Sequence, residues 1–365
     1  MVYNWNSRRE RKAFLALADG SVFRGWAFGK AVDCVGEAVF NTGMSGYQEI
    51  VSDPSYAGQF VALTTAEVGN YGCNAEDMES RGLFLAGLVV QGLNQSSNWR
   101  SEEELDDMMR RFGKPGIAGV DTRALTLHLR ATGAQRAFIH ASEDDVSVED
   151  AVRAAREWEG LDGKDYASLV TCESPYEWND GGEKHVVVYD FGVKYNILRQ
   201  LATSGFRVTV VPARTTAAEV LAMRPDGVLL SNGPADPSAV GYAIENARTL
   251  LGKVPLMGIC LGHQLLGIAC GAKCGRLKFG HHGCNHPVKD LRTGAVSISS
   301  QNHNFALSGL PKELELTHVN LNDGTVEGVR HRTLPAFSIQ YHPEAAPGPH
   351  DAQPLFSDFR SMMEA

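Results

Sequence analysis

The sequence has few features of a membrane or secreted protein. None of its apolar runs approaches the ~20 residues that cross a bilayer. Residues 1–12 are polar and contain neither the apolar stretch nor the cleavage site of a secretory signal. The seven cysteines, an odd number scattered over the chain, do not form the pattern of a disulfide framework. We therefore expect a soluble protein of the reducing cytoplasm.

Long basic clusters are also absent, and acidic residues outnumber basic ones, 43 to 34, for a formal net charge of -9. This balance argues against a nucleic-acid partner. The chain has no Gly-x-x-x-x-Gly-Lys-Ser/Thr loop and no dinucleotide fingerprint in a strand-to-helix context. We therefore expect that this chain binds no nucleotide cofactor.

A length of 365 residues predicts about two domains. The first, 1–172, is β-rich, with strand-like runs at 13–17, 38–41 and 60–64 and turn residues between them. A polar segment with Pro175, Gly181 and Gly182 predicts a linker at 173–184.

The second domain, 185–365, has a different pattern. Short apolar runs alternate with amphipathic helical stretches from 185 to 270, which predicts βαβ units and a mostly parallel sheet covered on both faces. The last part, after 295, is rich in strands and predicts an antiparallel extension. The overall fold class is therefore α/β, with a β-rich domain in front of it.

A nucleophile motif lies where one of these strands ends. Cys260 follows the run 255–259 and opens a helical stretch, with Gly258 and Gly262 on either side. Small neighbours tolerate the strained turn of a nucleophile elbow, and a helix N-terminus favours a thiolate. Taken alone, the motif is equally typical of a buried core cysteine.

A base for this thiol is present near the C-terminus. His342 and Glu344 flank Pro343, which favours extended backbone at His342. Residues two apart in an extended chain project to the same side, so Glu344 can orient the imidazole while its other nitrogen faces the sulfur. Taken alone, the segment is also typical of a surface turn.

Together, the two motifs resemble those of the class I (triad-type) glutamine amidotransferases. The resemblance covers 186 to the C-terminus and includes Gly258–Gln264, the segment Tyr341–Glu344, and 230–234, which is similar to the oxyanion loop of that family. It implies that glutamine is hydrolysed through a γ-glutamyl thioester, with Cys260 as nucleophile, His342 as base and acid, and Glu344 as its orienter.

The first half is similar to the N-terminal domain of carbamoyl phosphate synthetase small subunits. The segments that carry this likeness are Phe40–Glu49, Asp53–Tyr56, Gly69–Gly72 and Gly119–Arg123, and later Phe279–Gly283, Asn285–Pro287 and Gln301–His303. The resemblance implies a large-subunit partner that uses the ammonia with bicarbonate and ATP to make carbamoyl phosphate for arginine and pyrimidine biosynthesis. It also places ATP and metal ions on that partner.

The same resemblance implies a glutamine site. Its members are two backbone N–H groups of an oxyanion hole and several side chains, namely Gly233, Leu261, Ser55, Gln264, Asn302 and Phe305. Two further positions of this site, Ala235 and Asn304, depart from the family, which usually has glycine at both. If either position needs a positive φ, Ala is less well tolerated than Asn.

Three other interpretations compete with this one. Cysteines and histidines between 270 and 286 suggest a zinc site, yet Cys270 lies in an apolar helical stretch, and we expect no metal in this chain. A related amidotransferase for another synthetase would not need the first half. An inactive regulatory scaffold would not need an intact triad.

Overall fold

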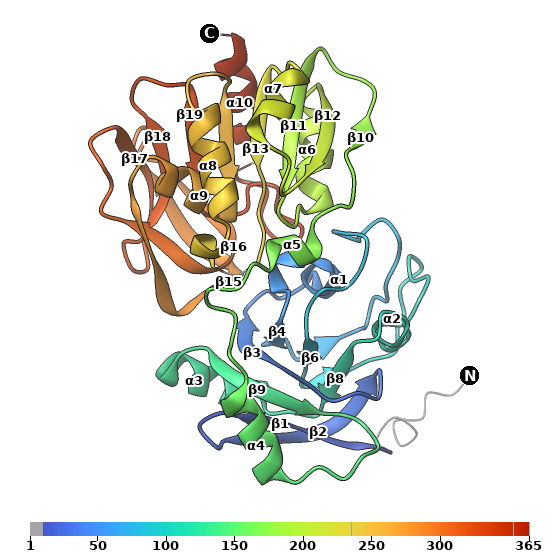
Figure 1. Cartoon of the computed structure of the whole chain (residues 1–365). Coiled ribbons are helices and arrows are strands. Elements are labelled where there is room, and N and C mark those ends of the chain that lie inside the picture. Colours follow the sequence, from blue (N-terminus) through green and yellow to red (C-terminus); the bar gives the residue numbers. More distant parts are fainter. Residues whose placement is uncertain (1–9, 235, 353, 365) are drawn as a thin grey trace. The chain divides into compact units, whose positions relative to one another are not determined.

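The computed structural model describes residues 10–234, 236–352 and 354–364 (Figure 1). The chain forms two compact units that meet between Leu161 and Asp162, which is earlier than the predicted boundary at 172. The segment predicted as a linker, 173–184, instead contains strand β10, Tyr176–Asn179, which pairs with β12. Its side chains Tyr176 and Trp178 pack on the core of the second unit, an alternation that the flanking Pro and Gly residues concealed.

The first unit is built on a closed barrel of strands in the order β1-β2-β8-β6-β4-β3-β9. These strands are β1 Lys12–Leu17, β2 Val22–Gly29, β3 Cys34–Asn41, β4 Gln59–Leu63, β6 Gly87–Val89, β8 Pro115–Ala118 and β9 Gln135–His140. A small sheet joins β5 Glu67–Val68 to β7 Gly92–Leu93. The helices are α1 Tyr47–Ser52, η1 Pro54–Tyr56, α2 Leu105–Arg111, α3 Thr122–Thr132 and α4 Val148–Glu157. The predicted β-rich character of this half is confirmed.

Motifs of the first half hold this unit together. The Tyr47 hydroxyl donates to the Gly72 carbonyl at 2.7 Å, and its ring stacks on that of Tyr71 at 4.1 Å between centroids. Asn41 Nδ2 donates to the Tyr56 hydroxyl at 2.8 Å. These segments, far apart in sequence, are therefore joined by buried hydrogen bonds.

The second unit is one ten-stranded sheet in the order β10-β12-β11-β13-β14-β19-β18-β17-β15-β16. The strands β12, β11, β13, β14 and β19 run parallel, as predicted, and the remainder pair antiparallel. Their bounds are β11 Lys184–Asp190, β12 Phe206–Pro212, β13 Gly227–Leu230, β14 Leu256–Ile259, β15 Lys273–Asp290, β16 Val296–Ser308, β17 Leu314–Asn320, β18 Val326–His331 and β19 Ala336–Ile339.

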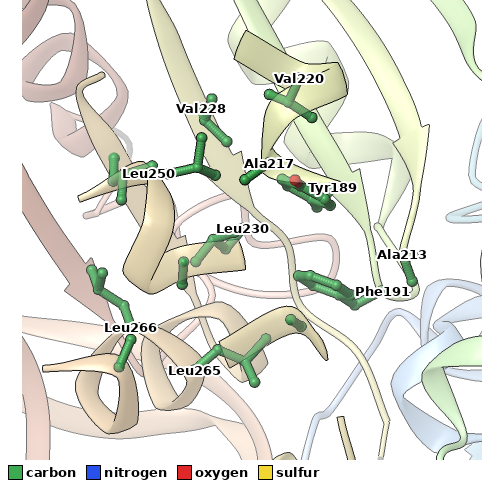
Figure 2. Packing of buried hydrophobic residues seen from close by; sticks show 14 of the residues in the cluster. Tyr189, Phe191, Ala213, Ala217, Val220, Val228, Leu230, Leu250, Leu265 and Leu266 are labelled. Carbon is green, nitrogen blue, oxygen red and sulfur yellow. The ribbon is translucent and has the colours of Figure 1, made fainter. Parts of the chain in front are cut away.

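Helices cover both faces of the parallel part. Figure 2 shows one core, in which Val220 of α7 and Leu250 of α8 pack over Val228 and Leu230 of β13, with Leu265 of α9 beside them. On the other face, α6 and α10 pack on the second core. The helices are α5 Ala167–Val170, α6 Tyr195–Thr203, α7 Ala217–Ala222, η2 Pro237–Ala239, α8 Gly241–Leu250, α9 Leu261–Ala269 and α10 Pro354–Glu364. Among the described residues, no helix combines the length and apolarity that spanning a membrane requires.

This topology gathers loops at one edge of the sheet. Because β11, β13, β14 and β19 are parallel, their carboxyl ends meet there, where ligand sites of open α/β sheets form. The segments that follow these strands contain Lys194, Asn232, Cys260 and His342.

Candidate active site

Cys260 occupies a strained turn between β14 and α9. Its φ of 54° and ψ of -103° lie outside the regions that a cysteine normally adopts. The neighbouring glycines make room for the turn, since a Cβ on Gly262 would lie 2.0 Å from the Leu230 carbonyl oxygen and one on Gly258 would lie 2.5 Å from that of Gly262. Such strain, ~1–3 kcal/mol, persists only where the surroundings fix it. The predicted elbow is therefore present.

The thiol of Cys260 is buried beside the hairpin strand β16. Its backbone N–H donates to the Ile339 carbonyl at 2.9 Å, which ties the elbow to β19. Its Sγ lies 3.5 Å from the Asn302 carbonyl and donates to it. Cys260 therefore lies directly before the first turn of α9, held against both β19 and β16.

His342 and Glu344 form the predicted pair. The His342 Nδ1 donates to Glu344 Oε1 at 2.7 Å, and both side chains are buried. The His342 backbone N–H donates to the Ser300 carbonyl at 2.9 Å, which fixes the segment against β16. The other ring nitrogen, Nε2, has no hydrogen-bond partner in the described part of the chain and remains available for the sulfur.

The charges of the site support one another. Burial alone would lower the pKa of His342, but the carboxylate of Glu344 and the nearby Cys260 outweigh burial and raise that pKa well above its ordinary value. Burial alone would raise the pKa of Glu344, but Lys194 and His342 lower it to about 2. The arrangement therefore favours an imidazolium beside the cysteine.

Lys194 is the residue that sequence reasoning missed. Its Nζ lies 3.0 Å from Glu344 Oε1 and also donates to the Ala345 carbonyl. Asn196 Nδ2 donates to the Glu344 carbonyl. Lys194 follows β11 at the same sheet edge as Cys260. Its position just after a predicted parallel strand could have marked it as a site residue from the sequence alone.

Two of the predicted backbone groups lie together. Gly233 is adjacent to Leu261, since a Cβ at Gly233 would lie 2.9 Å from Leu261 Cδ2 and 2.3 Å from the Phe191 carbonyl. Leu261 begins α9, where the first N–H groups have no partner within the helix. The Gly262 N–H donates to the Ser231 carbonyl at 3.0 Å, which holds the two segments in place.

The predicted glutamine contacts on α9 and β16 are also brought together. Gln264 Nε2 donates to the Phe305 carbonyl at 3.0 Å and to Gln340 Oε1 at 3.1 Å. The side-chain amides of Asn302 and Asn304 contact opposite nitrogens of the buried His282 ring, at 3.0 and 3.1 Å. Gln264 lies on α9 and Asn302, Asn304 and Phe305 on β16, and they are held by Gln340 after β19 and by His282 of β15.

The departures from the family pattern have different outcomes. Asn304 lies within β16 and is not among the residues with positive φ, so its backbone does not require glycine. Ala235 lies outside the described residues. Ser55 lies in η1 of the first unit, where its N–H donates to Asp53 Oδ1 at 2.9 Å, and its contact with glutamine stays a prediction.

Comparison with known proteins agrees with both halves. Residues 187–362 match the class-I glutamine amidotransferase family, and 15–139 match the CPSase domain of the carbamoyl-phosphate synthase small chain. The carbamoyl phosphate synthase small chains of Syntrophotalea carbinolica and Akkermansia muciniphila are each 52% identical to this chain, covering 97% of it and 98% of theirs. The chain belongs to the carbamoyl phosphate synthase small chain family.

A further relative carries a more specific name. The pyrimidine-specific carbamoyl phosphate synthase small chain of Bacillus subtilis is 49% identical, covering 97% of this chain and 96% of its own. The match to the small-chain domain at 15–139 disfavours an amidotransferase for another synthetase. Cys260, His342 and Glu344 all fall inside the matched amidotransferase domain.

Proposed function

We propose that Cys260, His342 and Glu344 carry out the glutamine hydrolysis of this small chain. The observation that carries the proposal is the strained Cys260 elbow, buried beside a histidine that is hydrogen-bonded to a carboxylate. A nucleophile, a base and an orienting acceptor in this arrangement are what covalent acyl transfer requires. An inactive scaffold would have no need to maintain the strain or the buried ion pair.

The reaction follows from this geometry. The Cys260 thiolate attacks the side-chain amide carbon of glutamine, and the oxygen of the tetrahedral intermediate accepts hydrogen bonds from the Gly233 and Leu261 N–H groups. The His342 imidazolium then gives its Nε2 proton to the leaving nitrogen, so the C–N bond breaks and ammonia departs. A γ-glutamyl thioester remains on Cys260.

The second half-reaction reuses the same base. Neutral His342 takes a proton from water, whose oxygen attacks the thioester carbon. Collapse of the intermediate releases glutamate and restores the Cys260 thiolate beside an imidazolium. Glu344, kept ionised by Lys194, holds the imidazole orientation throughout.

We assign glutamine binding to groups that surround this centre. They are Gly233, Leu261, Gln264, Asn302, Asn304 and Phe305, whereas the proposed roles of Ser55 and Ala235 in glutamine binding rest on the family resemblance alone. The short contacts among Gln264, Phe305, Asn302 and His282 support a preformed wall on the β16 side.

The product ammonia passes in this proposal to a large subunit, which uses it with bicarbonate and ATP to make carbamoyl phosphate. ATP and its metal ions are assigned to that partner. The name of the Bacillus subtilis relative supports a role in pyrimidine biosynthesis, and we extend it to arginine biosynthesis. The seven free cysteines support a reducing compartment such as the cytoplasm.

The test is copurification of the full chain with its native large subunit, followed by assay of carbamoyl phosphate from glutamine, bicarbonate and ATP. We expect synthesis by the complex and slow glutamine hydrolysis by the chain alone, because closure by a partner completes such sites. A complex that makes carbamoyl phosphate only from added ammonia would refute the proposal. If the isolated chain hydrolysed glutamine as fast as the complex does, the proposed coupling between the two subunits would be refuted.

A further inference from the structure

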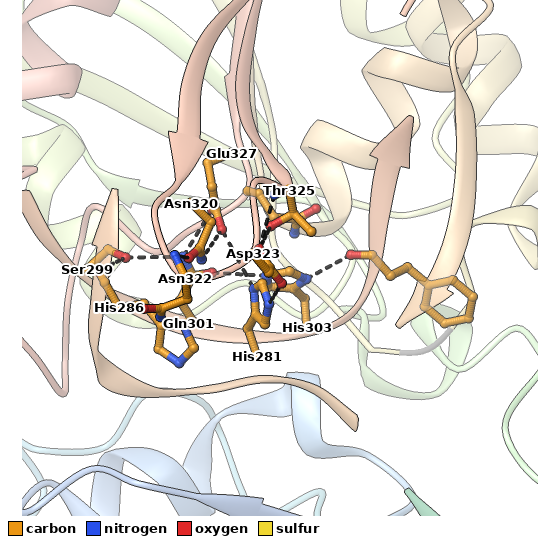
Figure 3. A network of polar contacts seen from close by, with 12 residues as sticks. His281, His286, Ser299, Gln301, His303, Asn320, Asn322, Asp323, Thr325 and Glu327 are labelled. Carbon is orange, nitrogen blue, oxygen red and sulfur yellow. Dashed lines mark hydrogen bonds and ion pairs between the residues drawn. The ribbon is translucent and has the colours of Figure 1, made fainter. Parts of the chain in front are cut away.

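A cluster of buried ligand-type side chains lies on the antiparallel part of the sheet, behind the β16 wall. His281 of β15 is directly opposite His303 of β16 in the strand register, and Glu327 comes from β18 (Figure 3). One nitrogen or oxygen of each lies within 4.8 Å of the others. The glutamine mechanism uses none of the three side chains.

The carboxylate of Glu327 has no lysine or arginine beside it among the described residues, and its one potential cationic neighbour is His281, whose Nδ1 lies 3.7 Å away. It is fully buried and accepts from Asn320 Nδ2 at 2.8 Å and from Gln301 Nε2 at 3.0 Å, both neutral amides. Within the described chain, no lysine or arginine pairs with it. A buried carboxylate whose close donors are all neutral is costly unless a cation lies beside it, and either an imidazolium at His281 or a metal ion held by His281 would supply that charge.

His281 offers an open nitrogen at this position. Its Nε2 contacts Asp323 Oδ2 at 2.8 Å, whereas its Nδ1 is buried without a hydrogen-bond partner, 3.7 Å from Glu327 Oε1. That separation is too long for a hydrogen bond. It is close to the ~3.4 Å that separates two ligands of a tetrahedral zinc ion with bonds of about 2.0–2.1 Å.

The hydrogen bonds of His303 leave its second ring nitrogen without a donor. Its Nδ1 lies 2.7 Å from the Phe305 carbonyl, which only accepts, so Nδ1 carries the proton and neutral His303 has a lone pair on Nε2. That lone pair faces the Gln301 amide at 3.0 Å. With the Gln301 oxygen toward His303, two acceptors meet there. With the amide reversed, its oxygen faces Glu327 instead, so in either orientation two acceptors face each other without a hydrogen between them.

We propose that His281 Nδ1, His303 Nε2 and Glu327 Oε1 bind a structural zinc ion. Two imidazoles and a carboxylate form an established type of zinc ligand set. Asp323 and the Phe305 carbonyl accept from the other ring nitrogens, as the partners of metal-bound histidines do. The fourth position falls to water or to His286, whose ring centroid lies 5.1 Å from that of His281.

This donor set differs from the one that spacing suggested. Cys270, Cys274 and Cys284 take no part in it, because Cys270 directly follows α9 and the other two lie elsewhere on β15. The ion would tie β15, β16 and β18 together. It would thereby steady the β16 segment whose Asn302 carbonyl contacts Cys260 and whose Ser300 carbonyl holds His342.

The test uses the full chain, stripped with a chelator and titrated with Zn²⁺ under calorimetry, with thermal unfolding recorded in parallel. We expect one zinc per chain and a higher unfolding temperature on zinc binding. The variant Glu327→Gln keeps the size of the side chain but should weaken zinc binding at least ~10–100-fold. Loss of a residue that only hydrogen-bonds to a metal ligand already lowers metal affinity by that factor. His318→Asn, which alters another buried histidine of the same sheet, should bind zinc like the parent.

Cobalt separates the two donor sets without any variant. Co²⁺ at this site should show the visible bands of a tetrahedral ion but no thiolate charge-transfer band in the near ultraviolet. A thiolate band would show that cysteines bind the ion and would overturn the assignment. Failure of the parent chain to bind zinc, or equal loss in Glu327→Gln and His318→Asn, would also overturn it and leave a protonated hydrogen-bond network.

Discussion

Lys194 Nζ lies 3.0 Å from Glu344 Oε1, and both side chains are almost fully buried. The carboxylate that orients the catalytic imidazole is therefore held between an ammonium and an imidazole, at 3.0 and 2.7 Å. Each cation keeps Glu344 ionised, and Glu344 in turn keeps His342 protonated. The triad is better described as part of a buried chain in which Lys194, Glu344 and His342 alternate in charge and which ends at Cys260.

The first prediction concerns Lys194→Met. Removing one partner of a buried ion pair leaves an uncompensated charge, so the free energy of unfolding at pH 7 should fall by ~3–5 kcal/mol. Lys184→Met is the matched control, because Lys184 pairs with Asp226 near the surface and such pairs contribute ~0–1 kcal/mol. Urea unfolding of both variants measures the difference. Equal losses of unfolding free energy in the two variants would contradict a stabilising role for the buried Lys194–Glu344 pair.

A second prediction separates the roles within the pair. Glu344→Gln should reduce the glutamine turnover number less than His342→Asn, because the carboxylate orients the imidazole while the histidine moves the proton. By analogy with other triads, losses of about 10⁴ and 10⁶ are expected. Steady-state glutaminase assays of the two variant complexes give the comparison, and equal losses would argue against this division.

The pH profile offers a third prediction. Glu344 stabilises the imidazolium, so its replacement by Gln should lower the pKa of His342. Because protonated His342 must give a proton to the leaving nitrogen, activity is present below that pKa and is lost as the pH rises through it. The alkaline limb of kcat/KM for glutamine should therefore move to lower pH in Glu344→Gln. An unmoved limb would mean that another group titrates there.

Gly262→Ala is the fourth prediction. The added Cβ would lie 2.0 Å from the Leu230 carbonyl oxygen and 2.6 Å from its carbon, backbone atoms that have little room to move. We expect a loss of ~1–3 kcal/mol or more in the free energy of unfolding and a displaced Cys260. Gly275→Ala, with no atom within 4 Å of its Cβ, should leave stability and glutaminase activity unchanged. Normal activity in Gly262→Ala would show that the elbow adapts.

Much of the second unit could be predicted from its pattern. The apolar runs and the two glycines around Cys260 indicated a parallel sheet and an elbow, because both depend on local backbone geometry. The spacing of His342 and Glu344 likewise indicated their contact. In the first unit, the strands could be predicted but the closure of their barrel could not, since closure depends on pairings between distant segments such as β1 with β9.

Long-range pairings also explain what was missed at the site. Lys194 is 150 residues from Glu344 in sequence, and only the sheet order brings the two together. The cluster of His281, His303 and Glu327 depends on the register of β15 with β16 and on the position of β18. Local spacing drew attention instead to neighbouring cysteines, which lie outside that cluster.

Glutamine-dependent synthesis depends most directly on Cys260, and one paired assay tests this dependence. The Cys260→Ser complex is given either glutamine or an ammonium salt, together with bicarbonate and ATP. A serine hydroxyl ionises far less readily than a thiol, so glutamine-dependent carbamoyl phosphate synthesis should fall by ~10⁴–10⁶, while synthesis from ammonia persists. Robust glutamine-dependent synthesis by this variant would contradict the assignment of Cys260 as the nucleophile, and loss of both activities would indicate a structural cysteine.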